Sequence, residues 1–384
     1  MIKTSLILFF IVSVIFSTIY TPQAILPTLQ KSFNLSMTQT NLLLSGMIFV
    51  LMVATPLYAP IVRRFEKKKI MMVTIFLLSM AVFLSAFSSN YYWLLLSRVM
   101  QGLFVPGITA IMLSYVQDIY PQEQRGLGMG IYMASTGFGA VMGRFLAGWI
   151  TYSYSWREAF VFFAILLLIA LLSMAWGLPS IGVRVQKSSI KKEALLSYLM
   201  DVKILSIVLI PMVVFFSFMA TSIFVTYHLS KAPFFLNERD LGTLFLIMLF
   251  SVVASPLAGR YSDKIGRVKI LFLALFLLML GMVLTLSSSL LGISMGIGLV
   301  TIGMFSVQSV TPTYLGDLVP DDRATVAVLY QTFFYMGGAL GTLLPVLAWD
   351  YGGYDGVVWL CLGLLLFGVS PVVYMILKRK MYAK

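Results

Sequence analysis

The chain has 384 residues, of which 60% are hydrophobic and 11% are charged, and its formal net charge is +13. Soluble domains carry about 25% charged residues, so this composition excludes a soluble globular fold. Uncharged stretches long enough to cross a bilayer of about 30 Å as helix recur along the chain. An all-helical membrane protein is expected, because lipid offers no hydrogen-bond partners to an exposed backbone.

Twelve membrane-spanning helices are expected, with both termini in the cytoplasm. The spans fall at residues 5–28, 39–62, 70–88, 92–115, 126–150, 157–178, 203–228, 240–258, 269–288, 290–313, 325–348 and 356–377. Of the 27 Lys and Arg, 21 fall on the ends and loops assigned to the cytoplasm, four fall on the opposite loops, and Arg98 and Arg144 lie inside spans. This asymmetry sets the orientation, because short loops rich in Lys and Arg stay on the cytoplasmic side.

The longest connection between spans divides the chain into two halves. It contains the basic amphipathic stretch "KSSIKKEALLSYLMDVK", which is typical of a helix that lies on the inner membrane face. We therefore expect a six-helix bundle over residues 1–178, a cytoplasmic linker over 179–202 and a second six-helix bundle over 203–384.

Three pairs of similar segments indicate that the two halves are related repeats. The basic turn "APIVRRFEKKKIM" (59–71) is echoed by "GRYSDKIGRVKIL" (259–271), and "YVQDIYPQEQR" (115–125) is echoed by "YLGDLVPDDR" (314–323). A Gly-x-x-x-Gly pattern at 139–143 also recurs at 337–341, so the offsets are 198 to 200 positions. Internal repeats of this kind are typical of secondary transporters, whose substrate site lies near the bilayer midplane.

Several motifs carry a resemblance to a known family. The loop 259–267 reads Gly-x-x-x-Asp-x-x-Gly-Arg, and "LLLSRVMQG" (94–102) and "YTPQAILP" (20–27) lie in the fourth and first spans. "GAVMGRFLAG" (139–148) has the spacing of a fifth-helix export motif, with an arginine where that motif has a proline. On these residues the chain resembles the major facilitator superfamily, and within it the twelve-helix drug/proton antiporter (efflux permease) branch.

The resemblance implies the major facilitator fold in the inner (plasma) membrane and alternating-access transport. It also implies proton-coupled efflux of small amphipathic compounds, although Thr18 stands near the position where related antiporters have an acid. Two alternatives stay open, namely a transporter of a small organic anion or metabolite that uses Arg98 and Arg144, and a membrane receptor or sensor. The helix-five motif residues are Gly139, Gly143 and Gly148, which let helices approach closely.

The expected partners are a small-molecule substrate, a proton and the lipid bilayer. We expect a monomer with no nucleic acid, no cofactor and no metal. An enzyme is not expected, because one His, one Cys and no acid in the middle of a span supply no catalytic constellation.

The cytoplasmic loops are candidates for gating. Asp263 is expected to follow a helix end and to face the positive N-terminus of the fifth span near Arg125; a charged loop that only sets topology is the alternative. Arg63 occupies the position equivalent to Asp263 and is expected to face an acid such as Asp322, with a solvated arginine as the alternative. The remaining members of this set are Gly259, Gly266, Arg267 and Arg323.

Arg98 and Arg144 are expected about six residues from the outer ends of the fourth and fifth spans, about 9 Å deep. A cation there costs roughly 2.5–3.5 kcal/mol on insertion scales and generally marks function. Either both contact substrate, or Arg98 bonds backbone carbonyls while Arg144 snorkels outward. The other candidates for substrate contact or coupling, for which interhelical hydrogen bonding is the alternative, are Tyr20, Gln23, Gln101, Gln308, Gln331 and Tyr335.

Overall fold

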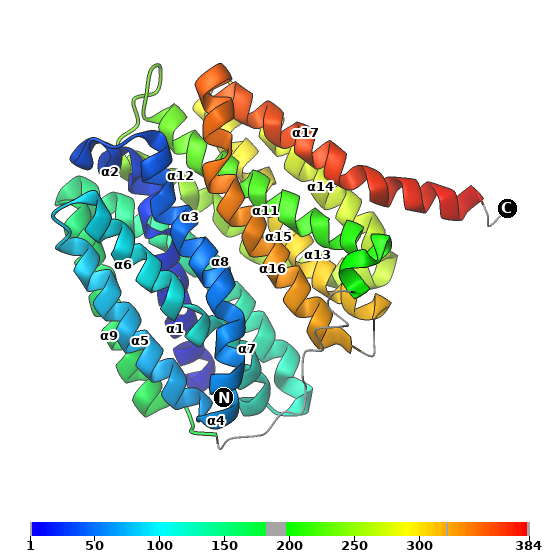
Figure 1. Cartoon of the computed structure of the whole chain (residues 1–384), viewed down its shortest axis with the longest axis horizontal. Helices are drawn as coiled ribbons and strands as arrows, with labels where there is room; N and C mark the ends of the chain where they lie inside the picture. Colours follow the sequence, from blue (N-terminus) through cyan, green and yellow to red (C-terminus); the bar gives the residue numbers. More distant parts are fainter. Residues whose placement is uncertain (1, 182–196, 320–321, 382–384) are drawn as a thin grey trace. The chain divides into compact units, whose positions relative to one another are not determined.

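The computed structural model describes residues 2–181, 197–319 and 322–381, and these residues are almost entirely helical (Figure 1). The N-terminal part contains α1 (Ile2–Tyr20), η1 (Thr21–Ile25), α2 (Leu26–Phe33), α3 (Met37–Ala54), η2 (Thr55–Leu57), α4 (Tyr58–Arg64), α5 (Lys67–Ala86), α6 (Tyr91–Phe104), α7 (Pro106–Ile119), η3 (Gln122–Gln124), α8 (Arg125–Ser153) and α9 (Trp156–Gly177). The C-terminal part contains α11 (Val202–Leu229), α12 (Glu238–Leu244), η4 (Phe245–Leu249), α13 (Phe250–Ile265), α14 (Arg267–Leu284), α15 (Leu290–Leu318), α16 (Arg323–Leu343) and α17 (Pro345–Met381). Most of the linker that is expected to hold an amphipathic helix lies outside the described residues.

Eleven helical segments within the described residues are long and apolar enough to cross a membrane. The all-helical membrane fold is therefore confirmed. The expected fifth span, α8, is not among the eleven, because its glycines and Arg144 lower its mean hydropathy. It has 29 residues, which at about 1.5 Å per residue exceed the thickness of a bilayer core. The total of twelve spans and the cytoplasmic termini stay predictions.

The chain forms two compact units. The first comprises Met1–Gln186 with Thr226–Val252, and the second comprises Lys187–Val225 with Val253–Lys384. The last residues of α11, all of α12 and η4 thus group with the N-terminal helices. The three-part division that the sequence suggests stays a prediction.

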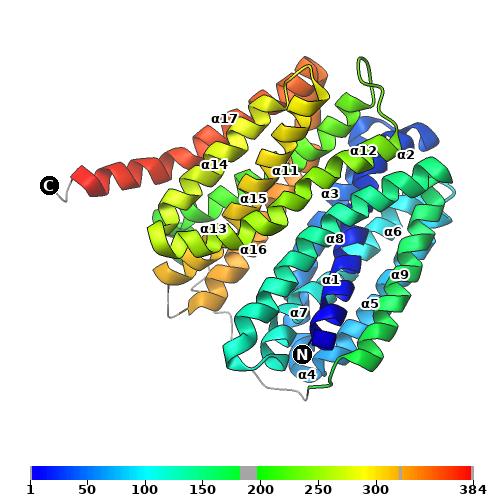
Figure 2. The ribbon, with the colours of Figure 1, turned by 180° about the vertical axis from the view of Figure 1, so that it is seen from behind.

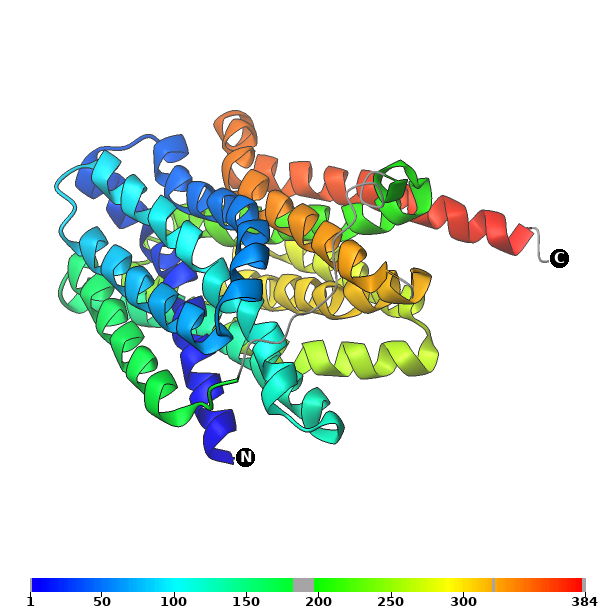
Figure 3. The same ribbon diagram turned by 60° about the horizontal axis from the view of Figure 1, so that its bottom comes forward.

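In the first unit, α1 lies between α8 and α9 (Figure 2), and α5 lies beside α9 (Figure 3). The contact between α1 and α8 is close because Gly139 and Gly143 have no side chains. A Cβ atom at either glycine would collide with a backbone carbonyl of α1, that of Ser13 or Ser17. The Ser17 hydroxyl also donates a hydrogen bond to the Gly139 carbonyl at 2.9 Å, so the two helices are joined as well as closely packed.

The second unit repeats this packing between α16 and α11. A Cβ atom at Gly337 or Gly341 would collide with the backbone carbonyl of Met212 or Phe216 on α11. The glycine pairs that echo each other in the sequence thus serve the same kind of helix contact.

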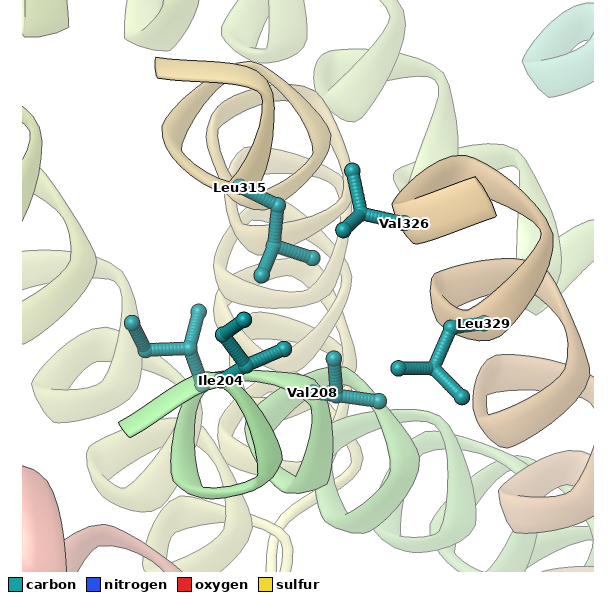
Figure 4. Close-up of a cluster of buried hydrophobic side chains, with 6 residues drawn as sticks. Ile204, Val208, Leu315, Val326 and Leu329 are labelled. Atoms are coloured by element: carbon teal, nitrogen blue, oxygen red, sulfur yellow. The ribbon is translucent and has the colours of Figure 1, made fainter. Parts of the chain in front are cut away.

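Apolar side chains of three helices form a buried cluster in the second unit. Figure 4 shows Ile204 and Val208 of α11 beside Leu315 of α15 and Val326 and Leu329 of α16. These helices come from distant parts of the sequence, so the cluster stabilises the unit through long-range contacts.

Candidate functional site

The first expected span is interrupted by a short 3-10 segment that directly follows Tyr20 and carries Gln23. α1 ends at Tyr20, and η1 begins at Thr21 with Pro22 as its second residue. Proline has no backbone N–H, so the carbonyl four residues earlier, that of Thr18, loses its α-helical partner. The interruption therefore frees the Thr18 carbonyl, which lies with the neighbouring Ile19 carbonyl and the Gln23 side chain in the interior of the first unit.

Arg98 of α6 satisfies those carbonyls. Its Nη1 donates to the Thr18 carbonyl at 3.2 Å and its Nη2 donates to the Ile19 carbonyl at 3.0 Å. Its Nε donates to the Leu43 carbonyl at 3.2 Å, and Nη1 also donates to Gln101 Oε1 at 2.5 Å. All three nitrogens of this buried guanidinium are engaged within the protein, which is the scaffold arrangement that the sequence left open.

Arg144 of α8 is also buried but has fewer partners. Its Nε donates to Gln23 Oε1 at 2.6 Å, and its Nη1 donates to the Ala140 carbonyl at 2.7 Å. Its Cζ lies 4.3 Å from the centre of the Tyr20 ring and 5.3 Å from that of Phe245. Since the side chain is buried, it does not snorkel to the surface.

Two donors of this cluster have no hydrogen-bond partner among the described residues. They are Arg144 Nη2 and Gln23 Nε2. Buried polar atoms in native proteins almost always find partners, so an exception calls for an explanation. The four ion pairs in the described part of the chain involve neither Arg144 nor Arg98.

The C-terminal candidates lie in the other unit. The Tyr330 hydroxyl donates to the Gln308 carbonyl at 3.5 Å, which joins α16 to α15. Tyr335 packs edge-on against Phe334 at 5.6 Å between ring centres, and the half-buried Gln331 lies one turn earlier on α16. Gln308, Gln331 and Tyr335 thus lie on neighbouring helices, whereas Tyr20, Gln23 and Gln101 belong to the unit with the arginines.

The intact loop signature forms an ion-pair cluster in the second unit. Arg267 Nε lies 2.6 Å from Asp317 Oδ2, and Arg267 Nη2 lies 3.5 Å from Asp263 Oδ1. Asp263 lies in the last turn of α13 rather than after the helix end, so that expectation was wrong by a few residues. Gly266 caps α14 with a φ of +100°, a conformation that glycine adopts at little cost.

The first unit holds an equivalent ion pair, which the sequence analysis missed. Lys67 Nζ lies 2.6 Å from Asp118 Oδ2. Lys67 precedes Arg267 by 200 positions and Asp118 precedes Asp317 by 199. The sequence did indicate this pair, because Lys67 lies in segment 59–71 and Asp118 lies in segment 115–125, and both segments are echoed in the second half.

The other gating residues have more local roles. Arg125 Nε donates to the Gln117 carbonyl at 3.0 Å. Asp322 caps α16 by accepting from Thr325 Oγ1 at 2.8 Å. An added Cβ at Gly259 would lie 3.1 Å from Ser309 Oγ, so this helix contact is also close. The side chains of Arg63 and Arg323 lie outside the described part, and their expected roles stay predictions.

Gly148, the last residue of the helix-five motif, packs against α12. A Cβ atom there would collide with the Glu238 carbonyl. One residue later, Trp149 Nε1 donates to Thr243 Oγ1 at 3.0 Å, and Arg239 Cζ lies 4.0 Å from the centre of the Trp149 ring. The motif therefore supports close contacts with α1 at one end and with α12 at the other.

Many long apolar helices in two units with equivalent helix contacts are typical of a multi-pass membrane transporter. The chain belongs to the Major Facilitator Superfamily, whose sequence profile matches residues 7–242 and 234–382. The fold, the location in the inner membrane and the absence of enzymatic function are thereby settled.

Relatives and a solved structure agree with this assignment. The chain is 27% identical over 369 residues to the uncharacterized MFS-type transporter YybF of Bacillus subtilis (strain 168), covering 95% of this chain and 91% of YybF. It is 24% identical over 346 residues to the inner membrane transport protein YnfM of Escherichia coli (strain K12), covering 89% and 83% of the two chains. A bacterial homologue of the human lysosomal transporter Spinster, in an inward-facing and unoccupied conformation, has the same fold, with a TM-score of 0.76, 16% identity and coverage of 96% and 95%.

Proposed function

We propose that this chain is a secondary active transporter that moves a small organic molecule by alternating access, and that Arg144 and Gln23 belong to its substrate site. The observation that carries the proposal is the pair of buried donors, Arg144 Nη2 and Gln23 Nε2, that no described residue satisfies. A donor without a partner in the protein gains a hydrogen bond when a ligand accepts from it, whereas a donor that is already paired must first lose one.

Proton-driven efflux of amphipathic compounds is the mode of transport that we favour. The helix-five motif supports export, and its glycines bring α8 against both α1 and α12. The rings of Tyr20 and Phe245 beside Arg144 give the site an apolar as well as a charged part. A gradient must supply the energy for uphill movement, since the sequence has no Walker-type phosphate loop.

The test is transport by the purified protein in proteoliposomes, with and without an imposed pH gradient. The probes are tetraphenylphosphonium as a lipophilic cation and a panel of radiolabelled aromatic carboxylates. Gradient-dependent movement of any of these compounds, reduced in Arg144→Ala but not in Arg64→Ala, supports the proposal. Arg64 is exposed on α4 and serves as the matched control. Movement that is unchanged in Arg144→Ala removes Arg144 from the substrate site.

A further inference from the structure

We propose that the substrate carries a single carboxylate, or a planar monoanion of the same geometry, which Arg144 and Gln23 bind together. This inference rests on the proposed function, because it names the chemical class of ligand for that site. It also chooses between the two arginines, since it gives the binding role to Arg144 and a supporting role to Arg98.

The donors match a carboxylate in kind. A guanidinium offers five N–H donors in a planar fork, and in Arg144 Nε and Nη1 already have partners in the protein whereas Nη2 has none. The unpartnered Nε2 of Gln23 belongs to the amide whose Oε1 lies 2.6 Å from Arg144 Nε. The two unpartnered donors therefore belong to side chains in direct contact, and a carboxylate has two oxygens to accept from them.

The charge of the site requires an anion rather than a cation or a neutral group. The Arg144 side chain is 1% exposed and Gln23 is 0% exposed. A buried charge is costly unless it is paired, and within the described residues Arg144 forms no ion pair. An anionic ligand supplies that missing charge, whereas a cation would add repulsion at the same place.

Aromatic rings make the anion site suitable for an amphipathic acid. Tyr20 is the last residue of α1 and Phe245 is the first residue of η4. The centres of both rings lie within 5.3 Å of Arg144 Cζ. They hold the guanidinium by cation–π contact. They also offer apolar surface beside the charged group, so an acid with an apolar body gains more from binding than acetate does.

Arg98 limits the ligand to one negative charge. Every nitrogen of Arg98 already donates to a carbonyl or to Gln101. A second anionic group would need a second cation with several free donors, whereas four of the five N–H groups of Arg98 already donate within the protein. We therefore expect a monocarboxylate to bind better than the dicarboxylate of the same skeleton.

The experiment measures binding to the full chain in lipid nanodiscs by ligand-dependent thermal stabilisation. The probes are benzoate, 2-naphthoate, indole-3-acetate and decanoate, each beside its uncharged amide, with 2,6-naphthalenedicarboxylate as the dianion. At least one monocarboxylate is expected to bind tenfold or more tightly than its amide, because a hydrogen bond to a charged partner is worth about 1.5–3 kcal/mol. Failure of all four acids to bind better than their amides overturns the inference.

Variants separate the site from general attraction of anions. Arg144→Gln and Gln23→Met are each expected to reduce the preference for carboxylate over amide at least tenfold, and Arg64→Gln is expected to leave it unchanged. Gln23→Met keeps a side chain of similar length, so it tests the site even where Arg144→Gln fails to fold. An equal loss in Arg64→Gln shows a nonspecific effect of charge and overturns the inference.

The same compounds in the proteoliposome assay distinguish the two proposals. Movement of tetraphenylphosphonium without binding of any acid overturns the monocarboxylate inference and leaves the transport proposal standing. Binding of an acid that Arg144→Gln abolishes, without gradient-dependent movement of any compound, supports the anion site and overturns the proposed transport through it.

Discussion

Arg98 and Arg144 illustrate how two buried arginines at similar depth acquire different roles. The difference depends on neighbouring backbone. Arg98 meets the Thr18 carbonyl, which Pro22 leaves without its α-helical partner, and the neighbouring Ile19 carbonyl. Arg144 lies on a continuous helix and reaches one backbone carbonyl, that of Ala140 one turn earlier. The two arginines are therefore equally buried but differ in how many of their nitrogens have partners in the protein.

Replacing Arg98 is expected to destabilise the protein strongly. Arg98→Met leaves the carbonyls of Thr18, Ile19 and Leu43 without these donors, and each unsatisfied buried group costs about 1–3 kcal/mol. Thermal unfolding in detergent, followed by tryptophan fluorescence, measures the effect. Arg64→Met is the control, since Arg64 is exposed. A melting temperature for Arg98→Met equal to that of the control contradicts the scaffold role.

Sequence reasoning located the two arginines but could not assign their partners. The position of a charge inside an apolar run is visible in the sequence, whereas the identity of the groups around it depends on how distant helices pack. One partner could have been predicted, because Pro22 removes the N–H that would bind the Thr18 carbonyl. The contribution of Phe245, more than 100 positions beyond Arg144, follows only from the fold.

At the scale of helices, glycine pairs decide how closely neighbours approach. The contacts of α8 with α1 and of α16 with α11 both place a backbone carbonyl where a Cβ atom would lie. The sequence predicted the close packing from the Gly-x-x-x-Gly spacing. It could not identify α1 and α11 as the facing helices, because the glycine spacing is a property of α8 and α16 alone.

Gly143→Ala is expected to lower stability although alanine is the better helix former. The new Cβ would collide with the Ser17 carbonyl, and overpacking of this kind costs roughly 1–3 kcal/mol. On the same helix, Gly130→Ala is the matched control, because a Cβ there has no neighbour within 4 Å. That control is expected to be neutral or slightly stabilising. Equal melting temperatures for the two variants would show that the helices separate without cost.

The ion pairs at the ends of α5 and α14 differ in exposure, and their strength is expected to differ accordingly. Lys67 and Asp118 have side chains 13% and 17% exposed, whereas Arg267 and Asp317 are 20% and 49% exposed. A double-mutant cycle to alanine should give a coupling energy of about 1 kcal/mol for the first pair and less for the second, because solvent screens exposed charges. Thermal unfolding of the four variants of each cycle gives both values. A larger coupling for the more exposed pair contradicts this ranking.

At the scale of the whole molecule, the repeat was visible in the sequence, but one interaction that its two units share was not predicted. The two basic loops differ most visibly at Arg63 and Asp263. The interaction that both units share instead joins Lys67 to Asp118 and Arg267 to its acid on α15. The reason is geometric. Comparing the sequence of segment 59–71 with that of 259–271 does not show that each packs against the next echoed segment of its own unit, 115–125 or 314–323.

The swapped pair of Arg63 and Asp322 stays a prediction that transport can test. Arg63→Asp is expected to reduce transport severalfold, and adding Asp322→Arg is expected to restore part of it. Because Asp322 also caps α16, Asp322→Asn is the control that removes the charge and keeps a good capping residue. Normal transport by both Arg63→Asp and Asp322→Asn, measured in the same proteoliposomes, excludes a working pair.

The interruption at Pro22 has a consequence for biogenesis. The Thr18 carbonyl that it frees belongs to α1, whereas its donor, Arg98, lies 80 positions later in the chain. Until α6 arrives, the first span carries unsatisfied backbone groups in lipid, and α6 in turn carries a charge that resists insertion. Both segments are apolar enough to span a membrane by themselves, and we expect each to be more stable there once Arg98 and the Thr18 carbonyl have met.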